Sequence, residues 1–195
     1  MIQLHQRSIL FLLAIFFTAL FALGQEEEDY KIKFGGPFTT ISFNKLGPSL
    51  SAGGGGVFLA SKNFYAGIFG QGTTSAFVRT SKILNQEYSL KSRQTGVWIG
   101  YSKKFKSNSK VRLTFYNKIG VGKVYLENSK ESLSYYNSTI VFTPNIEISY
   151  QLFYFLELGL STYYEFFTKV DLYGLNNSDL NAYGVSFLMK FRGSN

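Results

Sequence analysis

Few side chains in this sequence could carry out acid–base chemistry. The chain has no cysteine, and its one histidine, His5, lies in a segment that we expect to be removed. A general base that works near neutral pH is most often a histidine. What remains is a set of charged residues on one face of the predicted strands: Arg112, Lys118, Glu147, Glu157, Glu165 and Lys190. We interpret this set as a structural charge cluster and predict a non-enzymatic protein with no catalytic residue, cofactor or metal.

Alternation of apolar and polar residues predicts the strands that would position these charges. A period of two is the signature of a strand with two unlike faces. The pattern is clearest over residues 111–126, 140–152, 154–166 and 182–191. It is weaker over four earlier stretches, at about 36–44, 49–60, 63–77 and 90–103. Strands of nine or more residues suit a tilted crossing of a lipid bilayer.

The connections between these strands alternate in length. Short ones are expected at residues 61–63, at 104–109 and near 151–153, and the first external loop, near 44–48, would be unusually short. Long polar ones are expected at 78–89, 127–138 and 169–180. Outer-membrane barrels have short periplasmic turns and longer external loops. We therefore predict an all-β, closed, antiparallel up-and-down transmembrane β-barrel of about eight strands, with the long segments outside the cell.

The alternation alone does not say which face points inward. A soluble periplasmic lipid-binding barrel of the lipocalin type would turn the apolar face inward, and it is the alternative interpretation. Three features favour the membrane barrel. Small residues on the polar face suit a narrow eight-stranded lumen. Tyrosine and phenylalanine gather near strand ends, as in an interfacial aromatic belt. Charged residues make up only 16% of the chain, against roughly 25% in soluble domains.

The N-terminus has the pattern of an export signal. Arg7 precedes an apolar run from Ile9 to Phe21, which is short for a membrane-spanning helix, and Ala22-Leu23-Gly24 resembles a cleavage site. We predict a signal peptide over residues 1–24, an acidic leader over 25–33 and the barrel domain over 34–195. The net charge of +8 comes without a long basic run, so no nucleic-acid partner is expected.

Four stretches resemble a family of small outer-membrane β-barrel proteins known mostly from Bacteroidetes: GGPFTTISFNKLGPSLSAGGGGVFLASKNFYAGIFGQG, VWIGYSKKF, NKIGVGKVYL and VFTPNIEISYQLFYFLELGL. The resemblance covers roughly residues 34–191. It implies the barrel fold, a bacterial outer-membrane location, and membrane lipid and the outer-membrane assembly machinery as partners. It implies no catalytic residue and no ligand for the external loops. Many such barrels end on an aromatic residue, whereas here Phe191 is followed by Arg192-Gly193-Ser194-Asn195.

Two further features bear on the lumen. The run Gly53-Gly54-Gly55-Gly56 lacks the Lys-Ser or Lys-Thr of a phosphate-binding loop, so we expect a bulge or close strand packing there. Trp98 has Gly96 and Gly100 as same-face neighbours, and it fills either the lumen or the aromatic belt.

The turn centres predict particular charge pairs. A loop centred within 127–138 would bring Lys118 opposite Glu147, and a tight turn near 152 would bring Glu147 opposite Glu157. We therefore predict a lumen salt bridge between Lys118 and Glu147, with Glu157 beside it. Arg112 and Lys190 would offset Glu157 and Glu165, because a lone charge in a narrow lumen is costly.

Overall fold

The computed structural model describes most of the chain from residue 34 to residue 192. The ranges are 34–61, 63–76, 78–81, 86–105, 110–128, 134–170, residue 172 and 175–192. The predicted signal peptide, the acidic leader and the last three residues lie outside the described residues.

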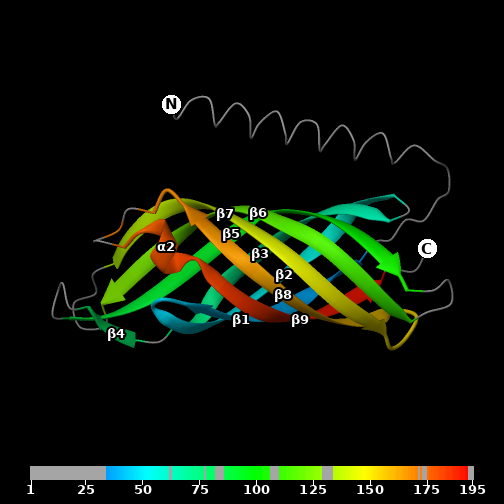
Figure 1. Cartoon of the computed structure of the whole chain (residues 1–195), viewed down its shortest axis with the longest axis horizontal. Coiled ribbons are helices and arrows are strands. Elements are labelled where there is room, and N and C mark those ends of the chain that lie inside the picture. The colour runs from blue at the N-terminus through cyan, green and yellow to red at the C-terminus, as the bar shows by residue number, and fades with distance from the viewer. Residues whose placement is uncertain are drawn as a thin grey trace, which may run out of the picture.

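Antiparallel strands make up nearly all of the described chain (Figure 1). They are β1 (Phe34–Asn44), β2 (Gly47–Ser61), β3 (Phe64–Ala76), β4 (Val78–Ser81), β5 (Gln86–Lys104), β6 (Val111–Asn128), β7 (Ser134–Gln151), β8 (Leu156–Thr168) and β9 (Ala182–Arg192). The short helix α2 (Asn177–Leu180) lies between β8 and β9. No helix in this part of the chain is long and apolar enough to cross a membrane.

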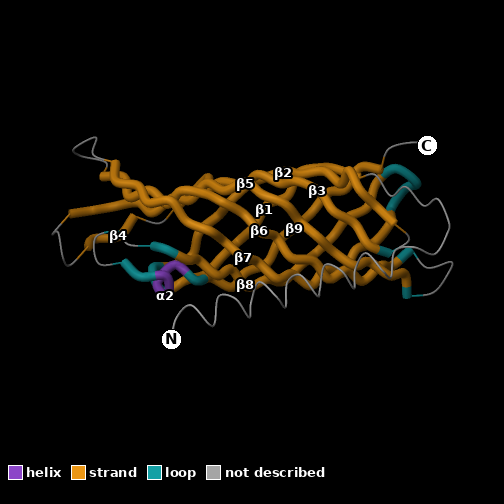
Figure 2. The backbone as a smooth tube through the Cα atoms, turned by 90° about the horizontal axis from the view of Figure 1, so that it is seen from above, coloured by secondary structure: helices purple, strands orange, loops and turns teal. Residues whose placement is uncertain are grey.

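The strands close into a barrel. Their order is β3-β2-β1-β9-β8-β7-β6-β5-β4, and β3 also pairs with β5, which joins the two edges and leaves β4 as a short extension outside the ring. Eight strands therefore form an up-and-down barrel, as predicted. Figure 2 shows the closed wall and the extension of β4 and its neighbours beyond one end.

The two ends of the barrel differ. One end, called here the turn end, carries the connections around residues 62–63, 105–110 and 152–155 together with Phe34 and Arg192. The other, called the α2 end, carries the remaining connections. The segments predicted as long loops at 78–89 and 127–138 are mostly strand, because β5 begins at Gln86, β6 continues to Asn128 and β7 begins at Ser134.

Side chains alternate between the lumen and the outer surface along the described parts of the barrel strands. In β8 the burial pattern alternates strictly from Glu157 to Thr168, and the buried residues include Glu157, Gly159, Ser161 and Glu165. The outward positions are apolar and exposed, as at Ile68 (59%), Val121 (61%) and Leu160 (62%). Aromatic side chains are exposed near both ends: Phe105, Tyr150 and Tyr154 at the turn end, and Tyr136, Tyr164 and Tyr183 at the α2 end. The apolar face of the barrel is thus its outer face.

An aromatic layer fills part of the lumen. Trp98 is buried at 3% exposure and lies near the rings of Phe34, Phe38 and Tyr116, so the lumen interpretation of Trp98 is correct. The glycine run lies beside it: a Cβ at Gly55 would come 3.0 Å from the indole ring. Register shifts between Leu50 and Ser51 and between Val57 and Leu59 flank the run.

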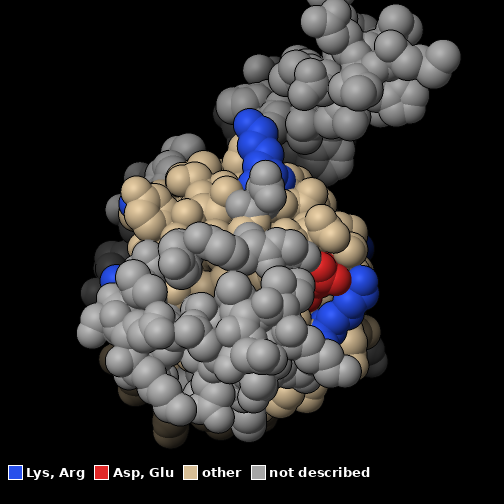
Figure 3. Space-filling model, turned by 90° about the vertical axis from the view of Figure 1, so that its left-hand side faces the viewer, with Lys and Arg blue, Asp and Glu red and all other residues tan. Residues whose placement is uncertain are grey.

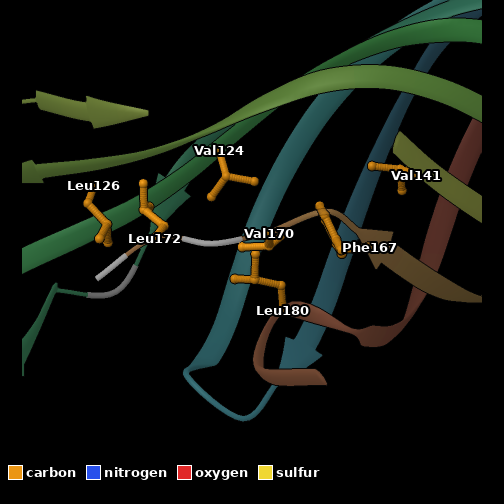
Figure 4. Packing of buried hydrophobic residues seen from close by; sticks show 7 residues of the cluster. All are labelled: Val124, Leu126, Val141, Phe167, Val170, Leu172 and Leu180. Carbon is orange, nitrogen blue, oxygen red and sulfur yellow. The ribbon is translucent and has the colours of Figure 1, made fainter. Parts of the chain in front are cut away.

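The connection between β8 and β9 closes the lumen at the α2 end. Val170, Leu172 and Leu180 are buried, and they pack with Val124, Leu126, Val141 and Phe167 from the barrel wall (Figure 4). Two asparagine side chains hold the segment in place. Asn177 Oδ1 accepts the backbone N–H of Val170 at 2.7 Å, and Asn181 Oδ1 accepts that of Phe167 at 2.9 Å. The stretch 169–180, predicted as a polar external loop, therefore has an apolar inner side that caps the barrel.

Candidate functional site

The charged residues inside the lumen are the candidate functional site, and they form two groups. The first, called the turn-end cluster, consists of Arg112, Glu147, Glu157 and Lys190 with Arg192. The second lies nearer the α2 end and consists of Lys118, Gln71, Gln94 and Glu165. Both groups arise because inward positions in β6, β7, β8 and β9 recur every second residue.

Lys190 is the centre of the turn-end cluster. It lies opposite Glu157 in the β8–β9 register, and its Nζ is 3.5 Å from Glu157 Oε1. The same Nζ donates a hydrogen bond to Glu147 Oε1, reaching past β8 at Gly159. A Cβ at Gly159 would be 3.0 Å from Glu147 Oε1, so the missing side chain leaves room for the carboxylate. Lys190 thus bridges two buried carboxylates that would otherwise repel each other.

Glu157 has several more partners. Ser149 Oγ donates to its Oε1 at 2.5 Å, Arg192 donates to its Oε2, and Arg112 Nε lies 3.9 Å from the same Oε2. Glu157 is 3% exposed, so its charge is compensated by cations and a hydroxyl rather than by bulk water. Buried charges persist in proteins when they are paired and hydrogen-bonded in this way.

Amide side chains connect Lys118 with Glu165 in the second group. Gln94 Nε2 donates to Glu165 Oε1 at 2.6 Å, and Gln71 Nε2 donates to the same oxygen at 3.4 Å. Lys118 Nζ donates to Gln71 Oε1 at 3.4 Å and lies 4.0 Å from the centre of the Phe38 ring. The ammonium group is therefore held by an amide oxygen and an aromatic face.

The predicted salt bridge between Lys118 and Glu147 is wrong, because both registers differ from the expected ones. Lys118 lies opposite Thr143, and Glu147 lies opposite Thr114 on β6 and Ser161 on β8. The turn between β7 and β8 spans residues 152–155 and closes by hydrogen bonds between Leu152, Phe153 and Leu156, so its centre lies further along the chain than expected. Glu147 pairs with Lys190 instead, while Lys118 lies with Glu165.

Three members of these groups were missed in the sequence. Arg192 lies inward because it follows Lys190 by two residues in β9, so extending the predicted strand by one residue would have identified it. Gln71 and Gln94 lie in the strands with the weakest alternation, and their uncharged amides gave no signal. With Arg192, the two groups hold four cations and three carboxylates.

This arrangement holds the lumen charges in place. Each of the three carboxylates accepts at least one hydrogen bond, from Lys190, Ser149 or Gln94. Within the described residues, no group of three histidine, cysteine or acidic side chains is placed to hold a metal ion. Two small cavities lie at the ends of the lumen, about 50 Å³ at the α2 end and about 10 Å³ at the turn end. The groups therefore fill and brace the lumen.

Comparison with known proteins identifies the fold. No protein-family model and no curated protein matches the sequence. Among solved structures, Neisserial surface protein A is similar with a TM-score of 0.60 at 10% identity, over 83% of this chain and 96% of that chain. A major outer membrane protein from Thermus thermophilus has a TM-score of 0.56 at 9% identity, over 84% of this chain and 100% of that chain.

A third similar structure is the N-terminal β-barrel domain of Pseudomonas aeruginosa OprF, with a TM-score of 0.54 at 9% identity. It covers 83% of this chain and 97% of that chain. At such identities the likeness concerns the fold alone. The chain has the closed, eight-stranded, antiparallel fold that these outer-membrane barrels share.

Proposed function

We propose that this protein is a non-enzymatic integral protein of the bacterial outer membrane, with the turn end in the periplasm and the α2 end outside. In this proposal it serves as a structural component of the envelope, or binds an external partner through the connections at the α2 end. Membrane lipid surrounds the wall, and the outer-membrane assembly machinery inserts it. Phe191 is exposed on β9 at the turn end, and we expect this aromatic residue to contact that machinery.

The outward apolar surface carries this proposal. Large apolar side chains are exposed on strands all round the barrel, among them Ile41, Ile68, Val97, Phe115, Ile146, Leu160 and Phe187. Soluble monomers rarely expose an apolar surface that continues around the whole molecule. In lipid the same surface is favourable, and the closed wall leaves no unpaired strand edge for the hydrocarbon to cover.

The filled lumen argues against the alternative of a soluble lipid carrier. Such a carrier needs an apolar cavity, whereas here the inward residues include ion pairs, amides and hydroxyls, and the cavities at the ends are small. The filling also argues against an open pore, since Trp98 and its aromatic neighbours occupy one layer and the cap at Leu180 closes the α2 end.

Reconstitution tests the proposal. Denatured protein diluted into phosphatidylcholine vesicles should fold, remain with the vesicles through flotation, and migrate differently on a gel with and without heating. A chain that stays soluble after detergent removal, with no vesicle association, would contradict membrane insertion. In whole cells, an added protease should cut at residues 82–85 or 129–133 and leave 106–109 intact, while the reverse pattern would invert the proposed orientation.

A further inference from the structure

Two cations lie directly opposite each other on the outer surface of the barrel. Arg93 of β5 pairs with Lys123 of β6 in the strand register, and both side chains point outward and are exposed. Like charges directly opposite on neighbouring strands destabilise a sheet. Among the described residues, neither side chain forms an ion pair with a carboxylate. The pair is therefore a concentration of charge for which the described part of the barrel supplies no carboxylate partner.

The surroundings hold both cations in position. The guanidinium carbon of Arg93 lies 5.9 Å from the centre of the Tyr125 ring, and Lys123 Nζ lies 4.6 Å from that of Tyr136. Both tyrosines lie one row further toward the α2 end, where they pair with each other. Gly72, opposite Arg93 on β3, has no side chain to cover the guanidinium. Each cation thus lies beside a tyrosine ring, and no side chain at position 72 covers the guanidinium.

The position of this pair along the barrel axis indicates its depth in the proposed membrane. The next two rows toward the barrel centre are largely apolar and exposed, with Val121 beside Ile140 and then Val97 beside Ile119 and Phe142. Tyrosine rings mark the polar–apolar interface of a membrane. In the proposed membrane, Arg93 and Lys123 therefore lie one row inside the tyrosines, next to the boundary between hydrocarbon and headgroups. Figure 3, which views the α2 end, shows Lys and Arg side chains at the rim of the barrel.

We propose that Arg93 and Lys123 together bind the phosphate of an anionic lipid headgroup, in the leaflet that surrounds the α2 end. The charges of the two side chains and of a phosphate are complementary. Side chains directly opposite on adjacent antiparallel strands start about 5 Å apart, so both cations can reach one phosphate group. The phosphate would neutralise the like-charge repulsion, while the acyl chains lie along the apolar rows below. This site rests on the proposed membrane function and adds a lipid class to it.

The experiment measures whether the folded protein binds phosphatidylglycerol more strongly than phosphatidylcholine. The protein is folded in phosphatidylcholine vesicles that contain a minor share of phosphatidylglycerol. Spin-labelled versions of the two lipids report how strongly each is held at the protein surface. We expect the natural protein to restrict the phosphatidylglycerol label more than the phosphatidylcholine label. The double variant Arg93→Gln/Lys123→Gln should reduce that preference, by about fivefold for each charge removed.

The matched control removes two charges from the same strand at the opposite end. Lys103 and Lys104 are both exposed, but they are consecutive residues of β5 and point to opposite faces. They therefore cannot bind one phosphate together. Lys103→Gln/Lys104→Gln should therefore retain most of the preference. An equal loss in both double variants would mean diffuse attraction by net charge and would overturn the site.

A single variant separates binding from structure. Lys123→Glu places a carboxylate opposite Arg93, so the barrel should become more stable in pure phosphatidylcholine while the preference for phosphatidylglycerol disappears. Retention of the preference in this variant would also overturn the site. If the natural protein inserts into vesicles but holds both labels equally, only this site fails. If it does not insert at all, the proposed membrane function fails with it.

Discussion

Gly67 lies against the indole ring of Trp98, so closely that a Cβ atom at position 67 would come within 1.9 Å of Trp98 Nε1. The same Cβ would lie 2.3 Å from the Gly56 carbonyl oxygen on the neighbouring strand. The ring cannot move freely, because Phe34, Phe38 and Tyr116 surround it. An eight-stranded lumen accommodates this tryptophan only because glycines line the wall beside it.

Substitution of Gly67 by alanine should therefore destabilise the barrel. We expect Gly67→Ala to cost about 1–3 kcal/mol, as overpacking of a filled interior does. The measurement is equilibrium urea unfolding of protein folded in vesicles, followed by Trp98 fluorescence. Gly70→Ala is the control, since Gly70 faces outward and its Cβ would meet only the Gln94 carbonyl oxygen at 4.0 Å. Similar losses from both variants would contradict the role assigned to Gly67.

Removal of Lys190 should be among the most damaging single changes in the lumen. Lys190→Met leaves Glu147 and Glu157 buried without their shared cation, and breaking a buried ion pair from one side costs about 3–5 kcal/mol. A double-mutant cycle that combines Lys190→Met with Glu147→Gln should give a coupling well above 0.5 kcal/mol, roughly the limit of additivity. The comparison cycle uses Lys118→Met with Glu147→Gln and should give a smaller coupling. A larger coupling energy for Lys118 with Glu147 than for Lys190 with Glu147 would indicate that Glu147 pairs with Lys118.

The strands could be predicted from the sequence because alternation is a local property. From β6 onward, most ends of the predicted strands lie within three residues of the observed ends. The alternation also correctly predicted that Glu157 and Lys190 point into the lumen. The pairing between the lumen charges could not be predicted from the sequence. Pairing depends on register, and a turn whose centre moves by two residues changes the partner of every residue in both strands.

The cap at the α2 end shows a second limit. In the sequence, residues 169–180 read as a polar loop because asparagine and aspartate are frequent there. Its buried residues, Val170, Leu172 and Leu180, belong to one cluster with residues of the barrel wall, so their burial depends on packing against strands that lie far away in the sequence. Packing of this kind leaves no local pattern in the sequence.

A charge placed on the outer wall should cost stability according to its depth. Leu160 is 62% exposed on β8 and lies between the two aromatic belts, so Leu160→Arg should cost about 2–4 kcal/mol in a bilayer. Tyr154 is 81% exposed at the turn end, and Tyr154→Arg should cost about 0–1 kcal/mol because it lies at the interface. Unfolding titrations in vesicles measure both. Equal costs, or none for Leu160→Arg, would show that this face is not in hydrocarbon.

The α2 cap should respond to acid through Asp179. The backbone N–H of Asn176 donates to Asp179 Oδ2 at 3.0 Å, and Lys45 Nζ donates to Oδ1 at 3.1 Å. These contacts hold the pKa of Asp179 below its ordinary value, the backbone hydrogen bond being the larger cause. A carboxyl whose pKa is lower in the folded state stabilises that state above its unfolded pKa, and the stabilisation is lost as the pH falls through the folded pKa.

We therefore expect the cap to be insensitive to pH from neutrality down to about 4 and to loosen below it, where unfolded aspartate takes up its proton. Since Lys45 is 65% exposed, its ion pair is screened by water and salt, and Lys45→Gln should change the titration only slightly. Asp179→Asn should abolish the acid transition, because its amide does not titrate. The amide resonance of Asn176, followed by NMR in micelles, reports the transition directly. The same acid shift of that resonance in the Asp179→Asn variant would assign it to another group and exclude Asp179 as the cause.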